Sequence, residues 1–226
     1  MEQSIFTKSI TYPMKGDNAL TRLAIGSIFV IFGVLLIPLV LVHGYFVRVA
    51  HSISNGESVP PDFDNWYSLF VDGLRLLAVL FVYFVAPFVL VVVGVTAVFA
   101  VPSIPYVGLD PLLVRRIFIA LGGVGLGLFL LCGYVAPAAV VNFARTGRMR
   151  SAFALRRIWP VLKTGSYATA WVLALGIMIT ANAVIGVLAI TVVGSLVGAL
   201  VYFYASIVST HLYTIGFQRI HHIESV

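Results

Sequence analysis

The sequence predicts an all-α fold, a helical integral membrane bundle of about five spanning helices with two interfacial amphipathic helices. Three observations predict it. Hydrophobic residues make up 61% of the 226 residues and charged residues only 10%, whereas roughly 25% are charged in an ordinary soluble domain. Several uncharged apolar runs exceed the roughly 20 residues that a helix needs to cross a bilayer. Alternating, strand-like patterns are absent, which leaves helices as the spanning elements.

The spans follow the apolar runs in order. Residues 23–42 alone are long enough for a first crossing. The apolar stretch 167–217 is too long for one crossing, so a tight turn near residues 193–195 divides it. The five predicted spans therefore begin at residue 23 and lie at about 23–42, 74–101, 117–144, 167–193 and 195–219.

The spans form a single transmembrane domain, residues 23–219, between a polar N-terminal segment and a short tail. The segment covers residues 1–22 and the tail 220–226. Within the domain a degenerate parallel repeat is predicted, with units of about 23–101 and 117–193, each a spanning helix, a surface helix and a second spanning helix.

Two glycines mark equivalent helix ends in this repeat. Gly56 and Gly147 each follow a basic helix end, where a C-cap glycine relieves a left-handed terminal conformation. Two further glycine pairs, Gly123 with Gly127 and Gly194 with Gly198, have the spacing at which helix backbones approach closely in membranes.

The connection at residues 145–163 carries six basic residues and no acid, so it is predicted to face the cytoplasm. Alternation then places residues 51–73, residues 145–166 and the C-terminus on the cytoplasmic side of a plasma membrane. The N-terminal segment would face outward with its own three basic residues. The alternative is a bent or re-entrant first segment, broken near Pro38, which would bring those charges inside.

The first predicted surface helix follows Pro60 and Pro61, which cannot continue a helix. Asp62 or Asp64 is the expected N-cap. The residues spaced for one apolar face are Trp66, Leu69, Phe70 and Gly73.

In the second predicted surface helix Ser151 can cap, and Arg156, Arg157 and Lys163 lie beside an apolar face. That face consists of Leu155, Ile158, Trp159 and Leu162. Trp and Arg at the edges of an apolar face suit the headgroup layer. The plainer interpretation makes both helices simple membrane-surface connectors.

The two connectors carry opposite charge, with four acids in residues 51–73 and six bases in residues 145–163. One hypothesis is that they pair with each other. The other is that the basic set binds anionic lipid. The formal net charge of +6 is accordingly read as headgroup contact, and no nucleic-acid partner is expected.

Polar residues inside the spans are few and mild, and no Asp, Glu or Lys lies deep in one. The intramembrane candidates are His43, Asn142, Asn182 and His211. A carrier would need all four to face one cavity, whereas hydrogen bonds to neighbouring helices explain them more simply. No metal, cofactor or catalytic set is expected, so an enzyme is the less favoured interpretation.

The stretch from Gly44 to Gly73 resembles the signature of a mainly archaeal family of multi-pass membrane proteins, known as domain of unknown function four-thousand-and-thirteen. The residues that carry the resemblance are Gly44-Tyr45, Arg48, Gly56-Glu57, Pro61, Phe63-Asp64-Asn65-Trp66 and Leu69-Phe70-Val71-Asp72-Gly73, with weaker matches at Ala152-Phe153, Tyr167 and Trp171. One departure is Pro137 in the second copy, where the first has Arg48. The resemblance implies a membrane protein and leaves its function open.

The favoured function is a non-catalytic scaffold or accessory subunit that binds membrane lipid through anionic headgroups, a membrane protein partner or a second copy of itself. The alternative is a channel or carrier for a small or lipid-like solute. The candidate binding residues are Phe63, Asp64, Trp66, Phe70 and Asp72, with Arg148, Arg150, Arg156, Arg157 and Trp159 as the basic surface.

Overall fold

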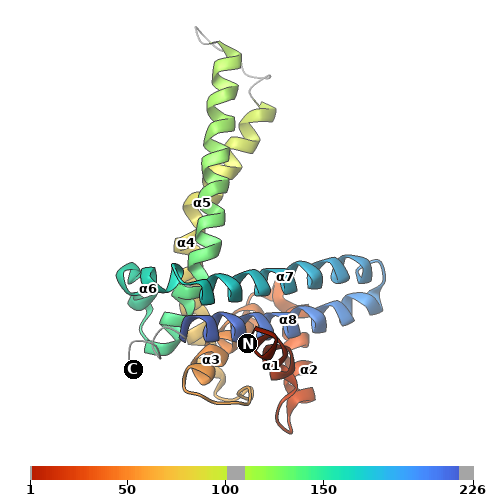
Figure 1. The fold of residues 1–226 in the computed structure, drawn as a ribbon. Helices are drawn as coiled ribbons and strands as arrows, with labels where there is room; N and C mark the ends of the chain where they lie inside the picture. Colours follow the sequence, from red (N-terminus) through yellow and green to blue (C-terminus); the bar gives the residue numbers. More distant parts are fainter. Residues whose placement is uncertain (1, 101–109, 219–226) are drawn as a thin grey trace. The chain divides into compact units, whose positions relative to one another are not determined.

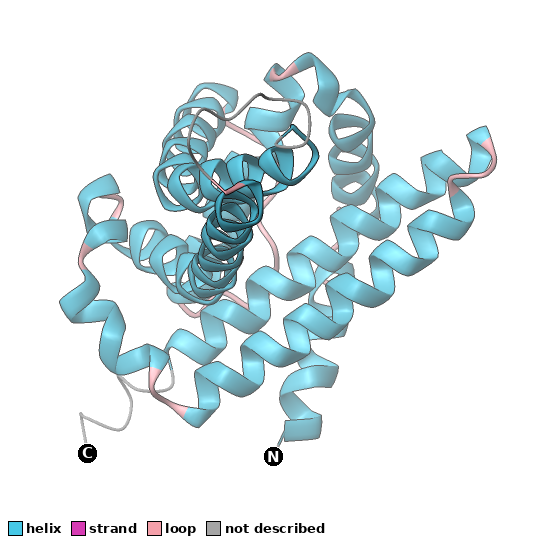
Figure 2. Cartoon of the chain, turned by 90° about the horizontal axis from the view of Figure 1, so that it is seen from above, coloured by secondary structure: helices cyan, strands magenta, loops and turns pink. Residues whose placement is uncertain are grey.

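The computed structural model describes residues 2–100 and 110–218, and every regular element in those ranges is a helix (Figure 1, Figure 2). This confirms the predicted all-α class. In chain order the elements are α1 (Glu2–Thr11), η1 (Tyr12–Met14), α2 (Ala19–Ile31), η2 (Phe32–Leu35), α3 (Ile37–Ser54), α4 (Trp66–Ala100), α5 (Pro111–Thr146), η4 (Met149–Phe153), α6 (Leu155–Leu162), α7 (Gly165–Leu188) and α8 (Val192–Gln218).

Within the described residues five helices are long and apolar enough to cross a bilayer, namely α3, α4, α5, α7 and α8. The last four correspond to the second to fifth predicted spans. The turn between α7 and α8 lies at residues 189–191, a few residues before the expected 193–195. Five such helices identify a helical membrane bundle.

The first predicted span is wrong as a single straight helix, because the chain breaks at Leu36. Leu36 has a φ of 63° and separates η2 from α3. Pro38 stands in the first turn of α3, where its missing N–H costs no helical hydrogen bond. The break lies two residues before Pro38, as the bent alternative expects.

The helices on either side of this break form an antiparallel pair. The Asn18 and Arg22 side chains, at the start of α2, both bond Asp62, which lies shortly after the end of α3. The segment before α2 therefore returns to the same end of the pair as the 55–65 connection. The α2–α3 pair packs on α8, which pairs with α7 as a second helical hairpin (Figure 1).

The chain divides into two compact units, Met1–Leu77 with Pro137–Val226, and Ala78–Ala136. The core of the first unit gathers residues from α2, α3, α4 and α8 around Tyr45 and Phe203. Its other fully packed members include Tyr12, Val49, Leu69 and Ile207. This core joins segments about 200 residues apart in the chain.

The helices α3 and α4 cross in backbone contact at two glycines of the first unit. A Cβ added to Gly44 would lie 1.8 Å from the Leu69 carbonyl oxygen, and one added to Gly73 would lie 1.9 Å from that of Val40. Only glycine lets the two backbones approach this closely.

The first predicted surface helix does not form as a separate element, because residues 66–73 are the first two turns of α4. Trp66, Leu69 and Gly73 share a face as expected, and that face packs on the rest of the first unit. The second predicted surface helix is present as α6.

The two predicted C-cap glycines are confirmed. Gly56 has a φ of 85° after α3, and Gly147 has a φ of 65° after α5. The Gly147 amide donates to the Phe143 carbonyl at 2.9 Å, and the Glu57 amide donates to that of Ser52 at 3.1 Å. These bonds satisfy the last carbonyls of each helix.

The second unit consists of the later part of α4 and the earlier part of α5. Cβ atoms added to Gly94 and Gly125 would meet the opposite backbone at 2.4 Å and 2.8 Å. The predicted contact glycines Gly123 and Gly127 are wrong, because an added Cβ at either meets nothing within 4 Å. On α5 the contact glycines are Gly125 and Gly122, the residue that Gly94 meets, and they are three residues apart. Gly123 and Gly127 are four apart, so spacing alone did not say which face of α5 would be used.

Candidate functional site

The connection between α3 and α4 folds back onto α3 through an aromatic stack. The Tyr45 hydroxyl donates to the Pro61 carbonyl at 3.0 Å. Its ring stacks on Phe63 with centroids 4.1 Å apart, and Phe63 stacks in turn on Trp66 at 6.1 Å. Phe29 of α2 meets both rings edge-on. The aromatic part of the signature is therefore an internal packing surface.

The acids of this connection pair with arginines of the surrounding helices. Asp62 binds the buried Arg22 at 3.0 Å. Asp64 binds Arg48, whose guanidinium also donates to the Asp64 carbonyl. The Asn18 amide and then the Arg22 guanidinium hold the pKa of the Asp62 carboxyl below its usual value. Each acid therefore ties the connection to a different helix.

Asp72 makes a more local ion pair. Its carboxylate lies 3.1 Å from the guanidinium of Arg75, one turn later on α4.

The prediction that Asp62 or Asp64 caps the following helix is wrong, because their carboxylates bind Arg22 and Arg48 instead. The cap is Asn65, whose side-chain oxygen accepts from the Ser68 amide at 3.3 Å. Asn65 holds a φ of 43°, which asparagine tolerates better than most residues.

The structure thus brings the candidate residues of the signature together, and most of them contact other residues of the chain. Phe63, Asp64 and Asp72 have partners within the chain, and Phe70 is half-buried. Trp66 leaves 47% of its surface exposed. Of the five, Trp66 offers the largest apolar surface to a bound molecule.

The hypothesis that the two connectors pair with each other is wrong for the described chain. The three ion pairs within residues 2–100 and 110–218 join Asp62, Asp64 and Asp72 to arginines of α2, α3 and α4. Three of the four acids in residues 51–73 are therefore paired with arginines of nearby helices, and no acid of the described chain is paired with the basic connector.

The basic connector is held to the end of α5 by a polar network around Ser151. The buried Asn142 donates to the Ser151 carbonyl at 2.8 Å, and the Ser151 hydroxyl bonds Thr146 at 2.6 Å. The expectation that Ser151 caps the surface helix is wrong, because α6 begins after Ala154, without a side-chain cap. Ser151 instead shapes η4.

The arginines of this connector form a surface that we call the basic face. Its members, Arg148, Arg150, Arg156 and Arg157, are all exposed. In the described part of the chain none of the four has an acidic partner within ion-pair distance. The basic face is therefore available to bind anions from outside the chain.

The helix α6 presents apolar side chains in two directions. Ile158, Val161 and Leu162 are buried in the first unit. Leu155 and Trp159 are 56% exposed each, and the Lys163 ammonium lies 5.0 Å from the Trp159 ring centroid. An exposed Trp and Leu beside arginines match a helix embedded at a headgroup layer.

The four intramembrane polar candidates lie in separate environments. His43 bonds the Leu39 carbonyl at 2.8 Å on its own helix, and His211 bonds Ser9 at 2.8 Å. Asn182 donates to the Met178 carbonyl and lines a groove of about 440 Å³. Asn142 belongs to the Ser151 network described above. The structure does not bring them to one polar cavity.

The sequence reasoning missed α1, which it treated as part of a polar segment. Together α1 and η1 turn by 83° from the line of α2 and η2. Phe6, Ile10 and Met14 follow one another at intervals of four residues and are all exposed by more than a third. That spacing was visible as the apolar stripe of an amphipathic helix.

Comparisons with known proteins agree with the signature. A family model described as "Protein of unknown function (DUF4013)" matches residues 27–193. No curated protein and no solved structure matches the chain.

Proposed function

This chain belongs to the DUF4013 family of proteins of unknown function, and we propose that it is a non-catalytic membrane scaffold whose basic face binds anionic lipid headgroups. The single observation that carries the proposal is the basic face itself. Its four arginines are exposed, and the ion pairs of the described chain leave all four without an acid.

The position of α6 supports a lipid as the ligand. Leu155 and Trp159 would enter the apolar edge of the headgroup layer while Arg156 and Arg157 meet the phosphates. Basic residues near an anionic membrane contribute about 1 kcal/mol each. Such a surface would orient the protein with α6 on the cytoplasmic side, as the positive-inside rule expects.

A carrier of a small polar solute is less well supported. It requires a continuous polar path, and His43, Asn182 and His211 each bond a different part of the first unit. The His43 and Asn182 bonds stay within their own helices, and the His211 bond joins α8 to α1.

The proposal is tested by the stabilisation that anionic lipid gives. Phosphatidylglycerol, compared with phosphatidylcholine, should raise the Tm of the detergent-solubilised protein at low salt. Replacing all four arginines of the basic face by Gln should remove most of that difference, because the headgroup contacts are lost.

The matched control is Arg115→Gln with Arg116→Gln, which removes two exposed charges from α5 outside the basic face. This control should keep the phosphatidylglycerol effect. Full retention of the effect by the fourfold variant, or a stoichiometric protein partner covering the basic face in a gentle extract, would contradict the proposal.

A further inference from the structure

A large apolar groove runs along α7 and α8 in the first unit, beneath α1 and the start of α2. It has a volume of about 870 Å³. Representative lining residues are Phe6 and Ile10 from α1, Val172 and Ile177 from α7, and Leu200 and Val208 from α8. Along α7 it extends from Val172 to Val184, which is roughly 18 Å at 1.5 Å per residue.

The groove offers almost no polar group to a ligand. Two hydroxyls line it, and both are already used. Thr180 donates to the Gly176 carbonyl at 2.9 Å, and Tyr204 donates to the Ile10 carbonyl. A cavity with such walls does not hold ordered water. Its chemistry fits a hydrocarbon chain.

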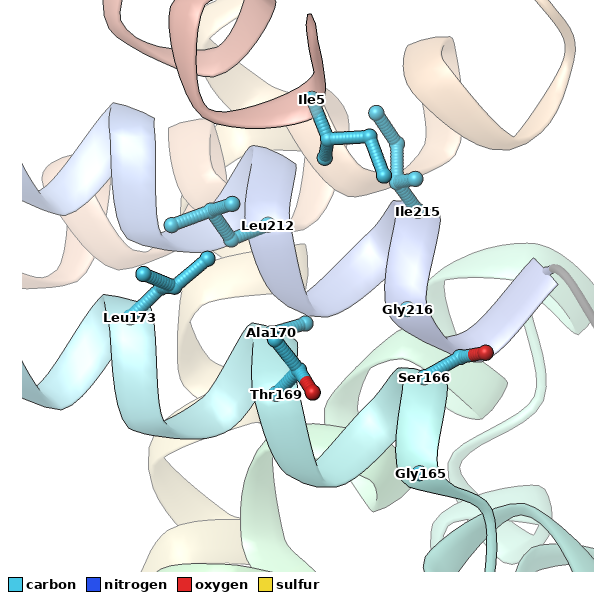
Figure 3. Close-up of a pocket in the computed structure, with 9 residues that line it drawn as sticks. All are labelled: Ile5, Gly165, Ser166, Thr169, Ala170, Leu173, Leu212, Ile215 and Gly216. Atoms are coloured by element: carbon cyan, nitrogen blue, oxygen red, sulfur yellow. The ribbon is translucent and has the colours of Figure 1, made fainter. Parts of the chain in front are cut away.

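A smaller and more polar pocket of about 290 Å³ lies at the start of α7, where Ile5 of α1 also lines it (Figure 3). Leu173 lines both hollows, which are therefore neighbours along α7. Figure 3 shows the Ser166 and Thr169 side chains on the first turns of α7, opposite Gly216 of α8. Neither hydroxyl has a hydrogen-bond partner among the residues that the structure describes.

The start of α7 makes the small pocket better suited to an anion than to a cation. Neither Lys8 nor Lys163 lines the pocket, and the Lys163 ammonium lies over the Trp159 ring. No acid lines either hollow. The first amides of α7 also carry the positive end of the helix dipole.

The helix α1 lies across one end of the groove and is fixed there by two contacts. The Ser9 hydroxyl bonds Nδ1 of His211 at 2.8 Å, and Tyr204 bonds the Ile10 carbonyl. Ile5 covers the small pocket, while Phe6 and Ile10 cover the groove. The hollow is therefore polar where α1 would meet the headgroup layer and apolar below it.

We propose that this hollow holds one phospholipid, with an acyl chain in the groove and the headgroup phosphate at Ser166 and Thr169. The match is between an apolar trough about one leaflet deep and a more polar pocket beside it, whose two hydroxyls have no partner in the described chain. The inference goes beyond the proposed function, since it assigns a stoichiometric site away from the basic face.

The test uses two glycines of α7 as a matched pair. A Cβ added to Gly176 or to Gly186 meets nothing within 4 Å, but only Gly176 lines the groove. Gly176→Phe fills the groove, and Gly186→Phe adds the same side chain to the same helix elsewhere. Native mass spectrometry on protein extracted gently from its membrane reads the bound lipid.

The wild type and Gly186→Phe should each retain one phospholipid per chain, and Gly176→Phe should bind about tenfold less. Ser166→Ala with Thr169→Val should reduce the bound fraction by at least about threefold. The fourfold Gln variant of the basic face should keep the lipid, which separates this test from the previous one.

Three results would overturn the inference. One is a wild-type protein without bound lipid. Another is equal retention by the two Phe variants. The third is a lipid-free dimer that Gly176→Phe converts to monomer, which would make a second copy of the chain the occupant.

Discussion

At the scale of single residues, the signature between Gly44 and Gly73 describes a helix crossing and the loop that closes it. The two glycines allow backbone contact between α3 and α4. Tyr45 and Phe63 stack beside that contact, and Asp62 binds the buried Arg22. These residues hold one end of the first unit together, which accounts for their occurrence in one signature without a ligand.

The Gly44→Ala variant should lower the free energy of unfolding by about 2 kcal/mol, because its Cβ would lie 1.8 Å from a carbonyl oxygen and force the helices apart. Thermal unfolding in detergent measures this. Gly186→Ala is the control, since an added methyl meets no atom there, and it should be neutral or slightly stabilising. Equal Tm values for the two variants would refute the crossing.

The Asp62–Arg22 pair should make stability depend on acid pH. The folded pKa of Asp62 is lowered by Asn18 and Arg22, so its contribution is complete above the unfolded pKa of about 3.9 and is lost as pH falls through the folded value. At pH 6 Asp62→Asn should cost at most about 1 kcal/mol, since 48% of the Asp62 side chain is exposed.

The measurement is the Tm difference between wild type and Asp62→Asn as pH falls from 6 to 3. The difference should shrink below pH 4. A difference that stays constant to pH 3 would mean that the Asp62 charge does not stabilise the fold.

At the scale of elements, single residues and their backbone conformation decide where the spanning helices begin and break. Leu36 takes a positive φ next to the Pro38 turn, so α2 and α3 fold as a pair where composition alone suggests one span. Conversely, residues 66–73 continue directly into α4, because no residue interrupts the helix before Leu74. The helix α6 buries one face and exposes the other, so it lies at the surface of the first unit.

Leu36→Gly should stabilise the protein by about 1 kcal/mol, because glycine adopts a φ of 63° without the strain that a Cβ causes. Leu35→Gly is the matched control, since residue 35 is equally exposed but belongs to η2. It should be neutral or destabilising. Denaturant unfolding in detergent measures the stability of both variants. A Leu36→Gly protein that is less stable than the wild type would argue against the helix break at residue 36.

At the scale of the whole molecule, polar contacts of the first unit tie three segments together at one end. Arg22 and Asp62 meet there, Gln218 at the end of α8 bonds the Ser54 carbonyl at the end of α3, and Ser9 bonds His211. The N-terminal segment, the 55–65 connection and the end of α8 therefore share one side of the bundle. If the basic connector faces the cytoplasm as proposed, the positive-inside rule expects the N-terminal lysines on that side too.

Cysteine labelling in sealed vesicles should place these segments on one membrane side. In a Cys132→Ala background, Lys15→Cys and Arg148→Cys should react with an impermeant maleimide from the cytoplasmic side. Ile190→Cys, in the exposed α7–α8 turn, should react only from the other side. Opposite labelling of Lys15→Cys and Arg148→Cys would contradict the returning first segment.

The sequence by itself determined the class of this protein, because apolar content and run length are local properties that a bilayer converts directly into helices. It also predicted the C-cap glycines Gly56 and Gly147, since helix ends are set by neighbouring residues. The basic face could also be predicted, because its four arginines lie within ten residues of each other in the sequence.

Only the tertiary structure decided which partners the remaining residues take. Asp62 pairs with Arg22, 40 residues away, and not with an arginine of the basic connector. Phe203 packs on Tyr45, more than 150 residues away. Such choices depend on how helices pack, and charge or hydrophobicity alone is not directional enough to specify them. The groove beneath α1 arises in the same way, because helices from the two ends of the chain, α1 and α2 with α7 and α8, build its walls.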